Sequence, residues 1–202
     1  MNQFSPKKLE KLCLYKLPEL QHICEEGSPI HPLLQFLQVL YVDECSSLRN
    51  LVPSSVTFCF LTYMEIENCS NMINLITPST ATSLVKLETM KVKGCNSLEE
   101  IVTEDHVDAE TKGEIISFHS LKILELENLE RLNCFSSSKC FLKFPLLEKA
   151  TVKQCPRMKI FSDRGTNTPK LKKVVIDEKV QEWCWEADLN GTIEKMFLDK
   201  VQ

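Results

Sequence analysis

Apolar residues recur along this chain in a repeated spacing rather than in one helical or strand-like period. The clearest unit is Leu-x-x-Leu-x-Val-x-x-Cys-x-x-Leu-x-x-Leu over residues 37–51. Copies with apolar residues in the same register begin near residues 9, 37, 61, 87, 121, 147 and 171. Repeats of this length are typical of solenoids, in which one structural unit is stacked many times. The pattern therefore predicts seven repeats over residues 1–182.

The spacing inside one repeat predicts its shape. In the Leu-x-Val part, apolar and other residues alternate, which is the pattern of a short strand with one buried face. In the part that follows, every third residue is apolar, so the chain turns back over the interior. One such unit leaves apolar edges uncovered, and only stacking of neighbours buries them. We therefore predict an α/β solenoid with short parallel strands on its concave face and irregular turns on its convex face.

Four repeats place a cysteine at the turn after the strand, namely Cys45, Cys69, Cys95 and Cys155. We interpret them as structural, because the side chain is small and apolar and its sulfur can accept weak hydrogen bonds from the loop. The ten cysteines include no Cys-x-x-Cys pair, and the four histidines fall at unrelated repeat positions. The sequence thus predicts neither a metal site nor a cysteine nucleophile.

Side chains that alternate with the inward pair are predicted to point out of the concave face. Their charges change sign from one strand to the next: Glu65 and Glu67, Lys91 and Lys93, Glu125 and Glu127, then Lys153. Two interpretations compete for these residues. Neighbouring strands can neutralise each other, at about 0.2–1 kcal/mol per pair, or the stripes can form a surface for a partner of complementary charge. We favour lateral neutralisation, since it follows from the register alone.

Three tyrosines, Tyr15, Tyr41 and Tyr63, fall on three consecutive predicted strands. Tyrosine is common at protein interfaces, because it combines apolar area with a polar tip. It also favours strands for their own sake. Both interpretations stay open, and the tyrosines join the charged stripes as candidate protein-binding residues.

Two segments depart from the repeat. The longest interval holds an acidic insertion over residues 102–117, which we expect to be a solvated loop, with docking of a basic neighbour as the alternative. Residues 183–202 are predicted to form a C-terminal cap. There, Trp183 and Trp185 would cover the last apolar edge, and the spacing over 189–200 predicts an amphipathic helix packed on that end. A membrane-surface helix is the alternative, but it would have little basic charge.

Composition narrows the class of function. With 43% hydrophobic and 26% charged residues among 202, the chain is globular, and a net charge of −4 argues against nucleic acid as a partner. The sequence shows no signal peptide and no apolar run of membrane-spanning length, so we expect a cytoplasmic, reducing location. Glycosylation triplets at Asn68 and Asn190 are expected to be incidental. No residue constellation suggests an enzyme, a cofactor or a small-molecule substrate.

The repeat, seen best over residues 87–101, resembles that of plant coiled-coil, nucleotide-binding, leucine-rich-repeat disease resistance proteins. The tail Trp-x-Trp-Glu-x-Asp-Leu-Asn-x-Thr-Ile over residues 183–193 resembles the closing segment of that family's repeat domain. The resemblance implies a leucine-rich-repeat horseshoe that acts as a sensor and autoinhibitory domain in defence. It also implies protein partners, namely a nucleotide-binding module at rest and pathogen or host proteins on activation.

The sequence departs from the family pattern in two respects. It has neither the phosphate-binding motif Gly-x-x-x-x-Gly-Lys-Ser/Thr nor a coiled-coil heptad run, so no ATP or ADP site is carried over. The first repeat begins close to Met1, which predicts an uncovered apolar edge at Leu9 and Leu12. A truncated or degenerate paralogue that acts as a standalone scaffold or adaptor is therefore the alternative function.

Overall fold

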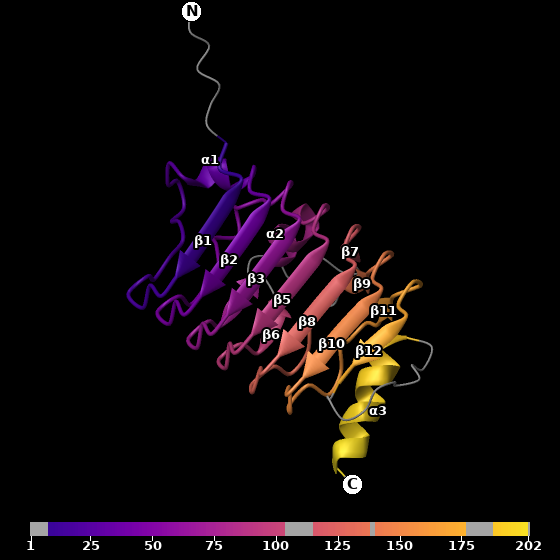
Figure 1. Cartoon of the computed structure of the whole chain (residues 1–202). Helices are drawn as coiled ribbons and strands as arrows, with labels where there is room; N and C mark the ends of the chain where they lie inside the picture. The colour runs from indigo at the N-terminus through magenta and orange to yellow at the C-terminus, as the bar shows by residue number, and fades with distance from the viewer. Residues whose placement is uncertain (1–7, 104–114, 138–139, 177–187, 202) are drawn as a thin grey trace, which may run out of the picture.

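The computed structural model describes residues 8–103, 115–137, 140–176 and 188–201, which form a solenoid (Figure 1). Its main element is a seven-stranded parallel sheet in which the strands follow one another in chain order. The strands are β1 (Lys11–Tyr15), β2 (Val39–Asp43), β3 (Tyr63–Glu67), β5 (Thr89–Lys93), β8 (Ile123–Glu127), β10 (Lys149–Lys153) and β12 (Lys173–Val175).

The sheet keeps one register through the stack. Val42 pairs with Ile66, Ile66 with Val92, and Val92 with Leu126, so each inward residue lies beside its counterpart one repeat away. All four of these side chains are fully buried. The predicted solenoid with repeats stacked in register is therefore confirmed, and the apolar interior runs along the whole stack behind the main sheet.

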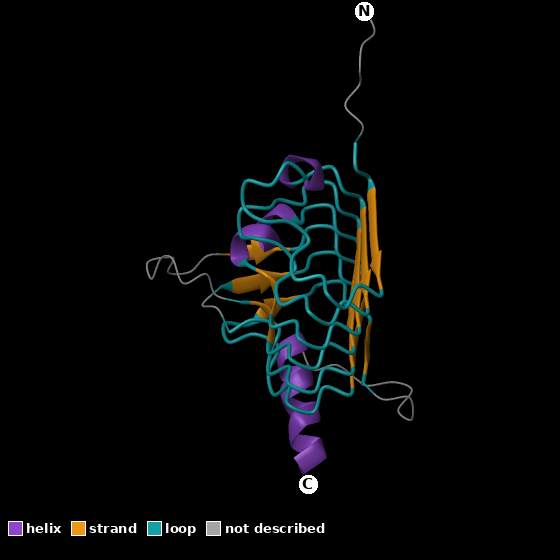
Figure 2. Cartoon of the chain, turned by 90° about the vertical axis from the view of Figure 1, so that its left-hand side faces the viewer, coloured by secondary structure: helices purple, strands orange, loops and turns teal. Residues whose placement is uncertain are grey.

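The face opposite the main sheet contains more regular structure than the irregular turns expected there. Figure 2 shows the smaller strands and two short helices on that side, connected to the main sheet by loops. One parallel pair joins β4 (Asn74–Ile76) and β6 (Glu100–Val102), and a parallel trio joins β7 (Ile115–Ser117), β9 (Phe141–Lys143) and β11 (Thr166–Asn167). The helices are α1 (His31–Leu34) and α2 (Pro78–Ser83).

The acidic insertion begins and ends in these short strands. Val102 lies in β6 and is fully buried, and Ile116 is fully buried in β7. Both ends of the segment are thus part of the solenoid wall, because each contributes an apolar side chain to the interior. The central part of the predicted loop, residues 104–114, lies outside the described residues.

A cluster of phenylalanines fills the interior of the C-terminal half. Phe118 stacks on Phe144 at 5.1 Å between ring centroids, and Phe135 stacks on Phe161 at 4.8 Å. The two stacked pairs meet edge to face, with Phe135 and Phe144 separated by 5.7 Å. Such offset and edge-to-face contacts stabilise aromatic pairs beyond the area that they bury.

The residue that follows each of six main-sheet strands has a left-handed backbone, with φ between 51° and 64°. This conformation costs an ordinary side chain about 1–2 kcal/mol, and glycine and asparagine adopt it most readily. Gly94, Asn68 and Asn128 suit it, whereas Glu44 and Gln154 do not. The turn is therefore a requirement of the repeat itself, which some copies meet with a poorly suited residue.

The turn cysteines lie in the positions predicted for them, and their sulfurs donate hydrogen bonds to strand carbonyls as well as accepting them from the neighbouring repeat. Cys69 Sγ lies 3.3 Å from the carbonyl oxygen of Glu67, two residues earlier, and Cys45, Cys95 and Cys155 make the same contact. A hydrogen bond with Cys69 and burial raise the pKa of Cys95, so it stays a neutral thiol. The nine cysteines that the structure describes are free thiols.

The two ends of the stack differ. At the first coil, Leu9, Leu12 and Leu14 are only partly buried, as expected for an uncovered edge. At the other end, α3 (Leu189–Val201) packs near β11, and Leu189 and Ile193 are buried. Trp183 and Trp185, expected to take part in this cap, lie outside the described residues.

Asn190 joins α3 to the last complete coil, which begins near residue 147. Its side-chain Oδ1 accepts a hydrogen bond from the Ser162 backbone N–H at 2.8 Å, and its Nδ2 donates to the Ser162 carbonyl at 2.5 Å. Ser162 pairs on its other side with Ser136 in a parallel bridge. The Asn190 amide therefore replaces the backbone of a further coil and satisfies the last rung of the ladder.

Candidate functional site

The candidate site is the sheet face, which we define as the outward-pointing side chains of the main sheet. Each five-residue strand presents three such positions, and not only the two assigned from the repeat pattern, because each strand begins one residue before its inward pair. The added position contains Tyr63 on β3 and Lys149 on β10, which lie in the same row of the register through Thr89 and Ile123.

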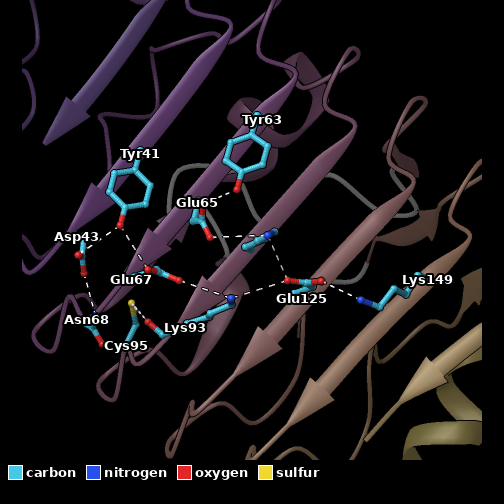
Figure 3. A network of polar contacts seen from close by, with 11 residues as sticks. Tyr41, Asp43, Tyr63, Glu65, Glu67, Asn68, Lys93, Cys95, Glu125 and Lys149 are labelled. Atoms are coloured by element: carbon cyan, nitrogen blue, oxygen red, sulfur yellow. Dashed lines mark hydrogen bonds and ion pairs between the residues drawn. The ribbon is translucent and has the colours of Figure 1, made fainter. Parts of the chain in front are cut away.

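The three tyrosines form a diagonal across this face. Tyr15 pairs with Asp43, Tyr41 with Glu65, and Tyr63 with Val39, so the rings occupy three different rows on β1, β2 and β3. Tyr15 is 52% exposed, whereas Tyr41 and Tyr63 are partly buried. In Figure 3 the rings of Tyr41 and Tyr63 lie on neighbouring strands with their broad faces toward the viewer.

The hydroxyl groups of Tyr41 and Tyr63 donate hydrogen bonds to carboxylates. Tyr41 contacts Asp43 at 3.4 Å and Glu67 at 3.5 Å, and Tyr63 donates to Glu65. Burial, together with the nearby Asp43 and Glu67, raises the pKa of Tyr41 to about 12. Burial and the bond to Glu65 also raise the pKa of Tyr63. The two phenols therefore stay neutral, and their rings are held in place by the carboxylates.

Asp43 is the most buried carboxylate of the sheet face, with 6% of its surface exposed. Its described partners are neutral, since Asn68 Nδ2 donates to it at 2.9 Å and the Tyr41 hydroxyl contacts it at 3.4 Å. A buried carboxylate is tolerated when hydrogen bonds replace its water. Asn68 in turn belongs to the left-handed turn, so the turn and the sheet face are directly linked.

The lysines of β5 lie between carboxylates of both neighbouring strands (Figure 3). Lys91 is 3.9 Å from Glu65 and 3.6 Å from Glu125. Lys93 is 3.6 Å from Glu67 and 3.9 Å from Glu125. These distances are long for hydrogen bonds but short enough for ion pairing. Lateral pairing across the strands, as predicted from the register, is thus present.

Glu125 is the centre of this network. Besides the two β5 lysines it binds Lys149 of β10 at 3.0 Å. The repeat pattern did not predict this contact, because it gave only two outward positions per strand. Burial opposes ionisation of Glu125, but the bond to Lys149 and the charges of the β5 lysines together lower its pKa. The sequence alone suggested that Glu127 shares this role. Glu127 does lie beside Lys93 and Lys153 in the register, yet within the described residues the ion pairs converge on Glu125.

A second row of alternating charges is formed by the residues that directly precede the strands. Lys122 pairs with Glu88 at 3.0 Å, and Lys172 pairs with Glu148 at 2.9 Å. A hydrogen bond with Lys172 lowers the pKa of Glu148. These four side chains are exposed, so water and salt screen both pairs. The repetition supports lateral neutralisation as a general device of this stack.

The opposite face carries a hollow of about 560 Å³. It lies beside β4, and its wall includes His22, Glu25, Asn50 and Asn74. Among the described residues, no three histidines, cysteines or carboxylates are grouped closely enough to hold a metal ion. Cys24 and His22 both line the hollow, but within the described part of the chain no hydrogen bond joins them, and burial raises the pKa of the Cys24 thiol, so the sheet face remains the candidate site.

Comparison with known proteins identifies the family. The model of "Plant disease resistance protein RPS2-like, leucine-rich repeats" matches residues 1–60 and 56–179. The chain belongs to this family. It is also 28% identical over 180 residues to a disease resistance protein of Arabidopsis thaliana, which covers 88% of this chain and 17% of the relative. No solved structure matches the chain.

The resemblance noted in the sequence is therefore correct at the level of the family. This chain is a leucine-rich-repeat region of the plant disease resistance type, and such regions serve in recognition and in protein interactions. The chain spans 17% of the length of its Arabidopsis relative. Within the described residues, no helix is long and apolar enough to cross a membrane.

Proposed function

We propose that this chain is the sensor and autoinhibitory repeat region of a plant intracellular immune receptor, and that it recognises proteins through its sheet face. The supporting observation is the sheet face itself. It gathers tyrosines, carboxylates and lysines on one regular surface of a family whose repeats serve in recognition. Tyrosine and charged groups held on a rigid scaffold are suited to specific protein contact.

The proposed partner at rest is the nucleotide-binding module of the receptor, and on activation a pathogen or host protein. The chain binds no cofactor and catalyses no reaction in this proposal, and it acts in the cytoplasm. The free thiols support the location, since a reducing compartment keeps cysteines unpaired. The standalone scaffold or adaptor is the competing function.

The test is co-precipitation of the chain with the coiled-coil and nucleotide-binding portion of a plant receptor of this class. Lys93→Glu places a third carboxylate between Glu67 and Glu125 on the sheet face. Lys143→Glu makes the same charge change on β9 of the opposite face, where Lys143 is exposed. The proposal expects Lys93→Glu to reduce capture severalfold and Lys143→Glu to leave it unchanged.

Folding of each variant is checked by thermal melting. If Lys93→Glu unfolds the chain, the experiment is repeated with Tyr41→Ala, which leaves the ion pairs of Lys91 and Lys93 intact. Equal capture of sheet-face and opposite-face variants that both fold rules out the proposal. A broad, weakly cooperative melting transition accompanied by aggregation favours the truncated or degenerate paralogue instead.

A further inference from the structure

The charge of the sheet face changes from one end of the stack to the other. The outward positions of β2 and β3 hold Asp43, Glu65 and Glu67 and no lysine. From β5 onward the described outward positions hold five lysines and two glutamates: Lys91, Lys93, Lys149, Lys153, Lys173, Glu125 and Glu127. The outward positions of β1 add one lysine, Lys11, beside Val39, so β1 to β3 together hold three carboxylates and one lysine and form the acidic part, whereas the C-terminal part of the face is basic.

The ion pairs inside the chain only partly neutralise the acidic part. Lys91 and Lys93 are each shared with Glu125, so Glu65 and Glu67 compete for cations that also serve β8. Asp43 is bound by the neutral groups of Asn68 and Tyr41. Negative charge on β2 and β3 therefore exceeds the positive charge within ion-pair distance.

The tyrosines lie on this same acidic part, and cations already pack on two of them. Lys16 lies 4.9 Å from the ring centroid of Tyr15, and Lys91 lies 5.8 Å from that of Tyr63. Tyr41 lies between these rings, and among the described residues no cation packs on its ring. Its broad face points outward, with carboxylates of β2 and β3 around its hydroxyl (Figure 3).

We propose that the part of the sheet face formed by β1, β2 and β3 binds an arginine-bearing segment of a protein partner. The guanidinium would stack on Tyr41 and pair with Glu67 and Glu65. Arginine fits better than lysine, because its planar group stacks on an aromatic ring and meets a carboxylate through two parallel hydrogen bonds. This inference rests on the proposed function, since it names the kind of partner that the sheet face takes.

The probe is an extended peptide in which arginine alternates with glycine, measured against the same peptide with neutral citrulline in place of arginine. Titration calorimetry with the full chain at about 0.15 M salt, where distant charges are screened, gives the two dissociation constants. We expect the arginine peptide to bind on the order of tenfold more tightly, from the combined stacking and ion pairing.

Variants locate the effect. Tyr41→Leu removes the ring and Glu67→Gln removes a carboxylate, and each should abolish most of the arginine preference. Tyr41→Phe keeps the ring and should retain it. Glu130→Gln is the matched control, because it makes the same charge change as Glu67→Gln at an exposed turn after β8.

Equal binding of the two peptides overturns the inference, and so does an arginine preference that Tyr41→Leu and Glu67→Gln leave unchanged in a folded chain. Both results are independent of the nucleotide-binding portion used to test the proposed function. If Lys93→Glu lowers its capture while the peptides bind alike, only the arginine inference fails. If the peptides bind as expected but sheet-face variants do not change capture of the nucleotide-binding portion, the proposed receptor function fails instead.

Discussion

The same strand motif is buried to very different extents at the first coil and in the middle of the stack. In β1, Leu12 and Leu14 point inward but stay partly exposed, whereas Leu124 and Leu126 in β8 are fully buried. The difference lies in the neighbours, because β8 pairs with β5 and β10 while β1 pairs with β2 alone. In a solenoid, a leucine becomes fully buried when both sides of its coil are covered.

The C-terminal end reaches nearly full burial without a further coil. Val174 in β12 is 3% exposed and Ile176 is 6% exposed, although β12 is also an edge strand. At this end α3 packs near β11, with Leu189 and Ile193 buried, and the Asn190 amide supplies hydrogen bonds for the backbone of Ser162. The two ends thus show how far inward side chains are buried at an open edge and at a capped edge.

The largest expected effect comes from shortening equivalent leucines in β8 and β1. Leu126→Ala should lower the free energy of unfolding by about 3–5 kcal/mol, because it leaves a cavity in a fully packed interior. Leu14→Ala should cost less than half as much, because water already reaches its side chain. Urea unfolding followed by circular dichroism measures both. Equal losses would mean that the first coil is as closely packed as the middle.

Removal of the cap should have the next largest effect. Asn190→Ala takes away both hydrogen bonds to Ser162 and should lower the stability of the last complete coil by about 1–3 kcal/mol. Hydrogen exchange should then speed up in β11 and β12 and stay unchanged in β2. The control is Asn74→Ala, which removes an exposed amide pair with Asn50 on the opposite face. A cap of no importance would give the same exchange pattern for both variants.

Substitutions in the left-handed turns should change stability by a smaller amount, upward in one case and downward in the other. Gln154→Gly relieves a side chain held at φ 51° and should stabilise the C-terminal half by about 0.5–1 kcal/mol. Gly94→Ala should destabilise, because its Cβ would lie 2.5 Å from Asn68 Oδ1. Thermal melting of both variants provides the measurement. A lower melting temperature for Gln154→Gly would contradict the account of turn strain.

The smallest effect concerns the charge network in the middle of the stack. The pKa of Glu125 is lowered in the folded chain, so its ionised form stabilises folding above the unfolded pKa. That contribution, on the order of 1 kcal/mol or less for a partly exposed network, should be lost as the pH falls below about 4. Glu125→Gln should flatten this part of the stability curve, and Glu130→Gln should not. Parallel curves for Glu125→Gln and the wild type would refute the role.

Much of the fold could be predicted from the sequence, because the period of apolar residues sets both the strands and their register. Once Val42, Ile66 and Val92 are aligned, the outward neighbours Glu65 and Lys91 must lie side by side. The lateral ion pairs follow from that alignment. The family resemblance came from the same positions, with the addition of the tail.

Other features depend on side-chain reach and backbone conformation, which periodicity does not report. The convergence of lysines on Glu125 depends on where Lys149 extends from a row that the repeat pattern did not include. The left-handed turns did leave a signal, since Asn68, Gly94 and Asn128 occupy one position in three repeats. The short strands opposite the main sheet are only two or three residues long, too short to show a period.

The hydrogen bonds of two asparagines have a consequence for glycan attachment. Asn68 and Asn190 each begin a triplet that oligosaccharide transfer recognises, and the reactive atom is the side-chain amide nitrogen. In the folded chain that nitrogen of Asn68 is bonded to Asp43, and that of Asn190 to the Ser162 carbonyl. A sugar attached to either nitrogen would replace one of its two hydrogens and crowd a contact of the folded chain, so attachment at either position should destabilise the fold.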